Sequence, residues 1–510
     1  MEPDDLRKRI NPAGWLLALV FATTALYGGW IAEDSLIPLR VVNQYWAGNG
    51  LVWNPGERVQ VCTSLLWQLI ILPLGAFPNL PLALLLFNCL LSGLFGFCLG
   101  HYSKSPWSAG IIASLWLASW STRDFMSCGL ETPLVALLLF NMALQASKNT
   151  SSKACAWAIG LVPLGRLDLA LLALPFAPAN VWSGRGNWLR IGTPVAIQSL
   201  FGAWYFGSPL PNTFYAKLCA GVEPENIGEA GLDYLELSLR SDPILGIAPL
   251  LAIAGLFLNR KKTMAWATTA GTVLYFVYSV KSADYMLGRF LVPCTLLAMS
   301  TLAFCRIPKY LALGAIALTL PLTWINNKTY KEGLHVVDEK GTHFGALTRD
   351  LLSDRYYENH SSATHANKIK SGETAPSACV GLLGILSPNN SRLIDGNRIT
   401  DPLLARLPAT FHKGYSPGHN KTDSPPYSEY FLTGNPATIK SPEIRKLAEL
   451  LKSAHNDPLW EPGRWQNIIE LFRFRLSNEE KFRLRYLDHR TGEVGKGFQI
   501  AWRGTEIPLN

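Results

Sequence analysis

Two adjacent carboxylates, Glu33 and Asp34, follow an apolar stretch of the chain at residues 15–31. An ionisable side chain at membrane depth costs about 2.5 to 3.5 kcal/mol on insertion scales, so charges that border such a stretch indicate a function or a partner. A carboxylate there can take the proton of an acceptor hydroxyl while a sugar carbon becomes positively charged. We therefore predict that Asp34 is a catalytic base, with Trp53 and Asn54 of the following loop lining a sugar pocket.

Other charged residues also gather at the ends of apolar stretches. They are Arg123, Asp124, Glu131, Arg166, Asp168, Lys217, Asp284 and Arg289. Arginine can hold a phosphate through paired donors and lysine as a point charge, and both favour the departure of that phosphate as a leaving group. Charged residues approached by apolar helices suit a substrate with a charged head and a long apolar tail. A sugar linked to a polyprenyl phosphate has this form.

The same residues also fit purely structural roles, and the sequence leaves that alternative open. Arg166 with Asp168, or Arg123 with Asp124, would then be ion pairs at the water interface. Glu33 would be solvated where its helix emerges. The Trp and Tyr residues would form an interfacial belt.

The hydropathy pattern defines the elements that must position these residues. An apolar run of about 18 or more residues is a candidate membrane span, because roughly 20 helical residues cross the hydrocarbon core. We predict eleven spans, at residues 13–31, 80–100, 106–121, 130–147, 153–165, 167–182, 188–206, 243–259, 263–280, 287–305 and 308–325. The predicted fold is a polytopic α-helical membrane domain over residues 1–325, with external loops at 32–79 and 207–242. Residues 326–510, which are richer in polar residues, are predicted to form a soluble α+β domain.

The positions of Lys and Arg in short loops predict the orientation, because positive residues are retained on the cytoplasmic side. With the N-terminus inside, the loops SKNTSSK and NRKK are cytoplasmic and basic, whereas the opposite loops pair acids with bases. Eleven spans then place the C-terminal domain in the periplasm of a bacterial inner membrane. The apolar segment at 63–77 is too short to cross and is expected flat in the interface or as a half-buried hairpin. The segment at 37–46 is expected along the surface.

Several classes of function are disfavoured by composition. The net charge of +9 lies largely in short loops, where orientation explains it, so nucleic acid is not expected as a partner. The nine cysteines contain no CxxC pair, which argues against a disulfide framework or a zinc site. The sequence also has no Walker loop or dinucleotide fingerprint, which fits a lipid-borne donor rather than a nucleotide sugar.

A series of motifs resembles the bacterial GT-C type polytopic glycosyltransferases, and among them the mycobacterial terminal arabinofuranosyltransferase family. In chain order these motifs are the Glu-Asp pair, GNGLVWNPGERV, TSLLW, GLETPL, GRLDLALLALP, FGSPLPNTFYAK, GRFLVPCTLLA, IDGNRITDPLLARLPA and GYSPGHN. The resemblance extends from about residue 30 to 425. The combined order is more specific than any single motif.

The resemblance implies a polyprenyl-phosphate arabinofuranose donor and an acceptor hydroxyl on the external face. Asp34 takes the role of the catalytic-loop acid, and Glu33 and Glu131 either assist it or hold a divalent cation. The implied donor-phosphate ligands are Arg166, Lys217 and Arg289. The implied sugar- or acceptor-binding residues are Glu131, Asp168, Asn212, Tyr215, Asp284, Trp53, Asn54 and His419. Neither the metal dependence nor the anomeric outcome follows from the sequence.

The expected acceptor is a cell-wall or surface polysaccharide, or a surface glycoprotein such as a pilin. In the tail, Asp401, Arg406, His412 and His419 are candidates to meet it. A different class of protein, a transporter or flippase of lipid-linked sugars, would prefer charges at mid-membrane and internal repeats. A third reading is an assembly protein without catalytic activity, whose tail binds glycan.

Overall fold

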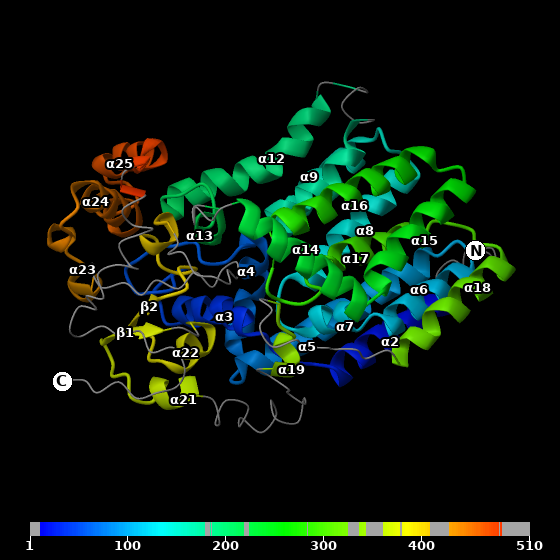
Figure 1. The fold of residues 1–510 in the computed structure, drawn as a ribbon, viewed down its shortest axis with the longest axis horizontal. Coiled ribbons are helices and arrows are strands. Elements are labelled where there is room, and N and C mark those ends of the chain that lie inside the picture. The colour runs from blue at the N-terminus through cyan, green and yellow to red at the C-terminus, as the bar shows by residue number, and fades with distance from the viewer. Residues whose placement is uncertain are drawn as a thin grey trace, which may run out of the picture. The chain divides into compact units, whose positions relative to one another are not determined.

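A computed structural model describes the chain at residues 11–178, 184, 186–218, 224–282, 284–324, 336–342, 361–377, 380–408, 428–478 and 480–481. Helices dominate these residues (Figure 1). The contacts divide the chain into two compact units, described separately below. The first unit comprises Met1–Ala32, Asn79–Ala196 and Ile227–Asp354, and the second comprises Glu33–Pro78, Ile197–Asn226 and Arg355–Asn510.

The first unit is built from helices. They are α2 (Pro12–Tyr27), α5 (Leu80–Tyr102), α6 (Pro106–Ala118), α7 (Trp120–Ser127), α8 (Thr132–Lys148), α9 (Lys153–Gly165), η2 (Leu167–Leu169), α10 (Ala170–Ala173), η3 (Leu174–Phe176), α15 (Ile244–Leu258), α16 (Lys262–Ser282), α17 (Val292–Leu302), α18 (Lys309–Thr319), η5 (Leu320–Trp324) and α19 (Glu339–Thr342). Two more helices, α12 (Gly186–Phe201) and α14 (Pro224–Ser241), contain the points where the chain passes between the units.

Close backbone packing joins α2 to α5. A Cβ atom on Gly100 would lie 2.3 Å from the carbonyl oxygen of Ala13, and one on Gly96 would lie 2.6 Å from that of Leu17. Glycine therefore lets the two backbones approach, as small residues do between membrane helices. Asn79 caps the start of α5 by accepting a hydrogen bond from the N–H of Leu82.

Helix length supports a helical membrane protein without fixing the number of spans. Among the described residues, α5 is long and apolar enough to cross a membrane, and up to three spans result if each of two bent helix pairs counts as one. These pairs are α7 with α8, bent by 111°, and Gly228–Ser241 with α15, bent by 80°. Helices α5, α8 and α9 lie close to their predicted bounds, whereas residues 167–176 form three short helices. The count of eleven spans therefore stays a prediction.

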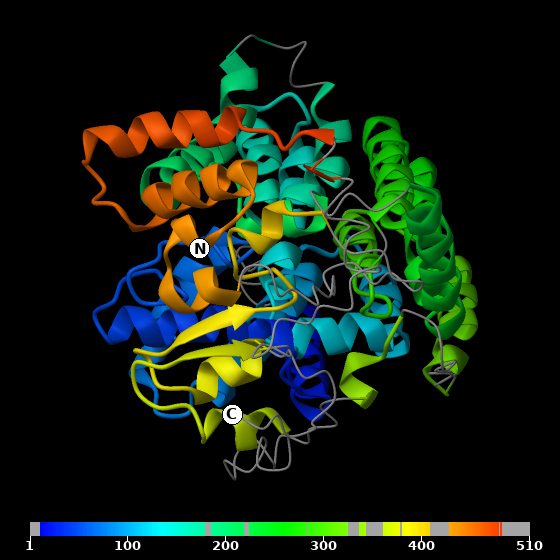
Figure 2. The same cartoon turned by 60° about the vertical axis from the view of Figure 1, so that its left-hand side comes forward.

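The second unit combines helices with a small sheet (Figure 2). Its strands β1 (Thr374–Ser377) and β2 (Arg392–Asp395) are parallel, with Thr374 opposite Arg392 and Ser377 opposite Asp395. Helix α22 (Val380–Leu386) makes the crossover that parallel strands need. Its other elements are α3 (Glu33–Trp46), α4 (Leu65–Ile71), η1 (Leu72–Ala76), η4 (Gly202–Phe206), α13 (Asn212–Leu218), α21 (Ser361–Ala366), η6 (Leu404–Arg406), α23 (Ser428–Thr433), η7 (Pro436–Thr438), α24 (Pro442–Asn456) and α25 (Pro462–Arg473).

Two apolar cores hold the second unit together. One joins α3 and the loop after it to the sheet and α22, and includes Ile37, Trp53 and Leu393. The other packs α24 and α25 against η6, with Leu404, Leu447 and Ile468. Residues of the loop predicted at 32–79 therefore share a core with residues of the C-terminal tail. The predicted boundary between a membrane domain at residues 1–325 and a soluble domain at 326–510 stays a prediction.

Candidate active site

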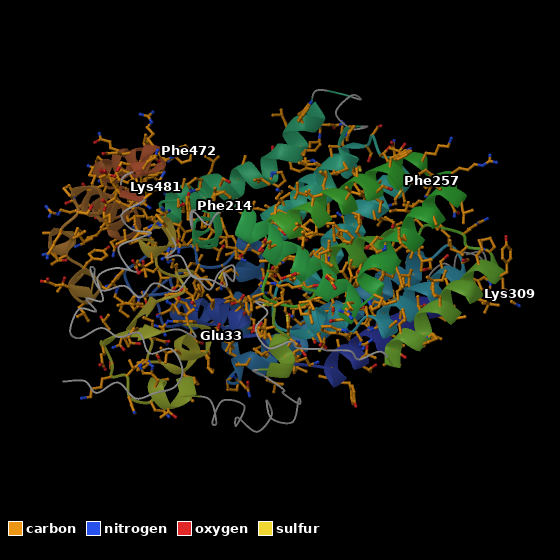
Figure 3. The ribbon with its side chains drawn as sticks, viewed as in Figure 1. Glu33, Phe214, Phe257, Lys309, Phe472 and Lys481 are labelled. Carbon is orange, nitrogen blue, oxygen red and sulfur yellow. The ribbon has the colours of Figure 1, made fainter. Side chains whose placement is uncertain are left out.

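The paired carboxylates lie in the first turn of α3, and Figure 3 labels Glu33. The Oε1 atom of Glu33 accepts a hydrogen bond of 3.0 Å from the N–H of Leu382 in α22. A Cβ atom on Gly381 would lie 2.1 Å from the carbonyl oxygen of Glu33. Glycine at position 381 therefore allows α22 to approach the start of α3. Asp34 is half-buried at the same helix start.

Burial and charge set the protonation of Glu33. Removal of the carboxyl from water, together with the charge of Asp34, raises the pKa of Glu33 to about 8, although the N–H groups of Leu382 and Gly381 oppose the change. At neutral pH, Glu33 is therefore mostly protonated. Glu33 therefore contributes little negative charge to the start of α3 at neutral pH.

Two more carboxylates organise the loop after β2. Asp395 accepts hydrogen bonds of 2.8 Å from the N–H groups of Asn397 and Thr400. Asp401 accepts bonds of 3.0 and 2.8 Å from Leu403 and Leu404. Burial raises the pKa of Asp395 to about 6 and that of Asp401 to about 7. Asp395 also lies close enough to Glu33 to raise the pKa of that residue.

Trp53 and Asn54 are engaged in the fold of the second unit. Trp53 is 1% exposed, and the Cζ atom of Arg40 lies 5.1 Å from the centre of its ring. Asn54 donates to the carbonyl of Leu393 at 3.0 Å and accepts from its N–H at 2.9 Å, which ties the loop to β2. Their predicted contact with a sugar stays a prediction.

Sequence reasoning missed the two residues that connect α3 to the tail. Arg40 is fully buried and donates to the carbonyls of Gly384, Ser391 and Trp53 at 2.6, 2.9 and 3.0 Å. Gln44, one helical turn later, donates to the carbonyl of Asn389 at 2.6 Å. The segment at 37–46 was expected along the surface, and this expectation is wrong. Its polar side chains Arg40 and Gln44 contact carbonyl groups more than 300 residues away in the sequence. The four-residue spacing of Arg40 and Gln44 was the available signal.

Asn212 and Tyr215 hold the DPLLARLP segment. The Nδ2 atom of Asn212 donates to the carbonyls of Ile399 and Asp401 at 2.8 and 3.1 Å. The hydroxyl of Tyr215 accepts a bond of 3.0 Å from Ser208, and the Cζ atom of Arg406 lies 3.9 Å from the centre of its ring. Lys217 is exposed in the last turn of α13.

In the first unit, Arg166 is paired on two sides. It donates to both carboxylate oxygens of Asp168 at 3.1 and 3.0 Å, and its Nε atom lies 3.9 Å from Glu131. The hydroxyl of Tyr275 also donates to Asp168. The ring of Phe290 lies 4.8 Å below the guanidinium. The ion pair suggested for Arg166 and Asp168 is therefore present, and the two carboxylates offset the charge of Arg166. The phosphate-binding role of Arg166 stays a prediction.

The loop before α17 contains Asp284 and Arg289. Asp284 is 4% exposed; its Oδ1 accepts from the N–H of Tyr285, and its Oδ2 has no hydrogen-bond partner among the described residues. Arg289 donates to the sulfur of Met286 at 3.2 Å.

Of the remaining candidates, two lie within the described residues and two lie outside them. Arg123 donates to the carbonyl of Trp116, whereas Asp124 forms an ion pair of 2.7 Å with Lys340, so these neighbours have separate partners. His412 and His419 lie outside the described residues. Within the described ranges, no group of three His, Cys, Asp or Glu side chains is placed to hold a metal ion.

The structure thus groups the predicted residues by unit. The second unit brings Glu33 and Asp34 together with Asp395, and it places Asn212 and Tyr215 against the segment that contains Asp401 and Arg406. The first unit groups Glu131, Arg166 and Asp168. The Asp34 carboxylate of α3 could accept a proton, and the basic residues could bind an anionic group.

These features define a mostly helical protein compatible with a membrane location, which carries buried carboxylates and ion pairs. Comparison with known proteins adds a specific likeness. The chain is similar to the terminal β-(1→2)-arabinofuranosyltransferase of Mycobacterium tuberculosis, with 31% identity over 237 residues, or 40% of this chain and 38% of that protein. It is also similar to the terminal β-(1→2)-arabinofuranosyltransferase of Corynebacterium glutamicum, with 26% identity over 411 residues, or 66% of this chain and 59% of that protein.

These matches confirm the resemblance predicted from the motifs. The chain spans less than two thirds of the length of either relative. No family model matches the chain. No solved structure matches it either.

Proposed function

We propose that this chain is a membrane glycosyltransferase that moves a pentofuranose, D-arabinofuranose, from a polyprenyl-phosphate donor to a hydroxyl of an acceptor in the cell envelope. The observation that carries the proposal is the similarity to two proteins named as arabinofuranosyltransferases. The half-buried carboxylate pair at the start of α3 supports it. A lipid-borne donor also fits a helical chain with apolar helices.

In the proposed reaction, the acceptor oxygen forms a bond to the anomeric carbon while the bond from that carbon to the phosphate oxygen breaks. Asp34 takes the proton of the acceptor hydroxyl, and the polyprenyl phosphate leaves with the electron pair. Glu33, held by the N–H of Leu382, is mostly neutral and does not add a second negative charge beside the base. Glu33 therefore assists Asp34 rather than replacing it.

Cationic side chains would stabilise the departing phosphate. Lys217 is exposed in the last turn of α13 and Arg289 lies in the loop before α17. Arg166 is retained as the third candidate, although Asp168 and Glu131 offset its charge. Asp284 lies in the same loop as Arg289 and is a candidate for a sugar hydroxyl.

The binding of the sugar and the acceptor is assigned to residues around these groups. Trp53 and Asn54 support the loop behind Asp34. Asn212 and Tyr215 position the segment of Asp401 and Arg406, which with His419 would meet the acceptor. The acceptor is a surface polysaccharide or a surface glycoprotein such as a pilin. The enzyme would lie in the bacterial inner membrane with a cytoplasmic N-terminus and a periplasmic C-terminal domain.

The test is incubation of the purified chain with a panel of polyprenyl-phosphate pentoses and candidate acceptors, followed by mass spectrometry of the products. Asp34→Asn should abolish transfer while donor binding persists, because the amide cannot accept the proton. Glu449→Gln, an exposed carboxylate on α24, is the matched control and should transfer normally. A flippase would move the donor across vesicles without transfer and would be insensitive to Asp34→Asn, so that outcome would replace this proposal.

A further inference from the structure

The second unit contains a cavity of about 710 Å³ between the segment at 207–215 and α25. We call it the α25 cavity. Its walls include Phe214 of α13, Leu447 of α24, and Ile468, Leu471 and Phe472 of α25. Figure 3 labels Phe214, Phe472 and Lys481, three of its lining residues. Its volume falls in the range of pockets that bury small ligands, and its walls are largely apolar.

The polar groups of this cavity do not suit a sugar. Ser208 and Tyr215 both line it, but they already share a hydrogen bond of 3.0 Å. The ring of Tyr215 is covered by the guanidinium of Arg406 at 3.9 Å, so it is not an open surface for a sugar ring. The other polar side chains of the lining are Asn478 and three basic residues, and the lining offers no carboxylate to accept from the hydroxyl groups of a sugar.

The charged side chains that line the cavity are all basic. Arg406, Arg475 and Lys481 line it, and its described lining residues include no carboxylate. Glu443 and Glu480 lie next to the lining residues but are not among them, and they accept hydrogen bonds from Ser477 and Ser441. The site therefore combines an apolar interior with an excess of positive charge.

The outer side of α25 exposes large apolar residues close to these cations. Phe472, which also lines the cavity, is 63% exposed, and Ile469 is 52% exposed. Arg473 and Arg475 follow directly and are exposed. Exposed apolar side chains bordered by basic residues are typical of surfaces that bind anionic lipids.

We infer that the α25 cavity binds an anionic lipid, with an acyl chain along Leu447, Ile468 and Leu471 and its phosphate at Arg475 and Lys481. Charge complementarity and the continuity between the apolar walls and the exposed side of α25 argue for this occupant. The inference involves no reaction step and does not depend on the proposed glycosyl transfer.

The test uses native mass spectrometry of the full chain in a neutral detergent. Dioleoyl phosphatidic acid should bind more tightly than dioleoyl phosphatidylcholine, which has the same chains. The double variant Arg475→Glu/Lys481→Glu should weaken binding of phosphatidic acid by about tenfold or more, since each basic residue near a lipid surface contributes about 1 kcal/mol. Lys368→Glu/Lys370→Glu makes the same charge change at exposed positions away from the cavity lining and should leave binding unchanged.

A second variant separates the apolar contribution from the charge. Phe472→Ser, at an exposed position, should weaken phosphatidic acid binding while leaving the cations in place. Three outcomes would overturn the inference. The first is equal binding of both lipids, and the second is an equal loss of binding in the two double variants. The third is no loss of binding in either Arg475→Glu/Lys481→Glu or Phe472→Ser. Displacement of the lipid by millimolar inorganic phosphate would show a simple phosphate site instead. Because no sugar is transferred in the assay, its failure is distinct from a failure of the proposed function.

Discussion

At the scale of single residues, the environment of Glu33 changes the meaning of the acidic pair. The sequence shows two neighbouring carboxylates, but the structure gives Glu33 a hydrogen bond from α22 and enough burial to keep it largely protonated near neutral pH. Asp34, beside it, remains the residue proposed to accept a proton. Neighbours of the same chemical type can therefore have different roles, set by what packs on each.

The raised pKa of Glu33 has a consequence for stability. Its pKa is about 8 in the folded chain, above the ordinary value of 4.5, so between these values the folded state binds more protons than the unfolded state. This contribution to stability is therefore present at low pH and is lost as pH rises from about 5 to 8. Glu33→Gln keeps an oxygen acceptor for Leu382 but cannot ionise. Its melting temperature should change less over this pH window than that of the unmodified chain.

Thermal unfolding of the purified full chain at pH 5, 6, 7 and 8 checks this expectation. Glu449→Gln, on the exposed side of α24, serves as the control and should follow the unmodified chain. Asp395 and Asp401 have raised pKa values as well, so some pH dependence persists in Glu33→Gln. Identical pH profiles for Glu33→Gln and the unmodified chain would contradict the assigned burial of Glu33.

At the scale of elements, the contact of α3 with α22 depends on two glycines and one arginine. Gly381 allows α22 to reach Glu33, and a Cβ atom on Gly384 would lie 2.3 Å from the ring of Trp53. Arg40 then satisfies the carbonyl of Gly384 and two others. Hydropathy indicates which segments form helices, but it cannot indicate that a guanidinium on α3 meets carbonyls near residue 390.

Removal of the Arg40 guanidinium should destabilise the second unit strongly. Arg40→Met keeps the apolar stem but removes the donor to the carbonyls of Gly384 and Ser391, whereas the carbonyl of Trp53 keeps its bond from Gln44, and we expect a loss of about 3 to 5 kcal/mol in the free energy of unfolding. Denaturant unfolding measures this loss. Arg445→Met is the control, because Arg445 donates to a single carbonyl, that of Ile439, and should cost less than about 1.5 kcal/mol. Equal losses in the two variants would show that the buried network adds little.

The glycine contact makes an independent prediction. Gly381→Ala places a Cβ atom against the backbone carbonyl of Glu33, which cannot move aside as a side chain can, and should cost about 1 to 3 kcal/mol. Gly463→Ala in α25 meets no atom within 4 Å and should be neutral or slightly stabilising, because alanine favours a helix. The melting temperatures of the two variants compare these effects directly. A stabilised Gly381→Ala variant would show that α22 does not pack on the start of α3.

At the scale of the whole molecule, local patterns in the sequence predicted several helices but did not predict which distant segments pack together. The apolar runs predicted α5, α8 and α9. The motifs predicted the arabinofuranosyltransferase resemblance that the comparisons confirm. The sequence suggested the ion pair of Arg166 with Asp168. It could not show that Arg166 also lies near Glu131, or that residues after position 32 share a core with β2.

The orientation of the chain gives the last prediction. Basic loops around residues 147–153 and 259–262 indicate the cytoplasmic side, and an odd number of spans places the C-terminus on the opposite side. Alkaline phosphatase fused after residue 510 should therefore be active in a bacterial host, whereas green fluorescent protein fused there should not fluoresce when exported through the general secretory route. Fusions truncated after Asn149 or Asn259 should show the reverse pattern. Phosphatase activity that is low at the C-terminus and high at Asn149 and Asn259 would invert the orientation and place the Asp34 carboxylate on the side without the proposed acceptor.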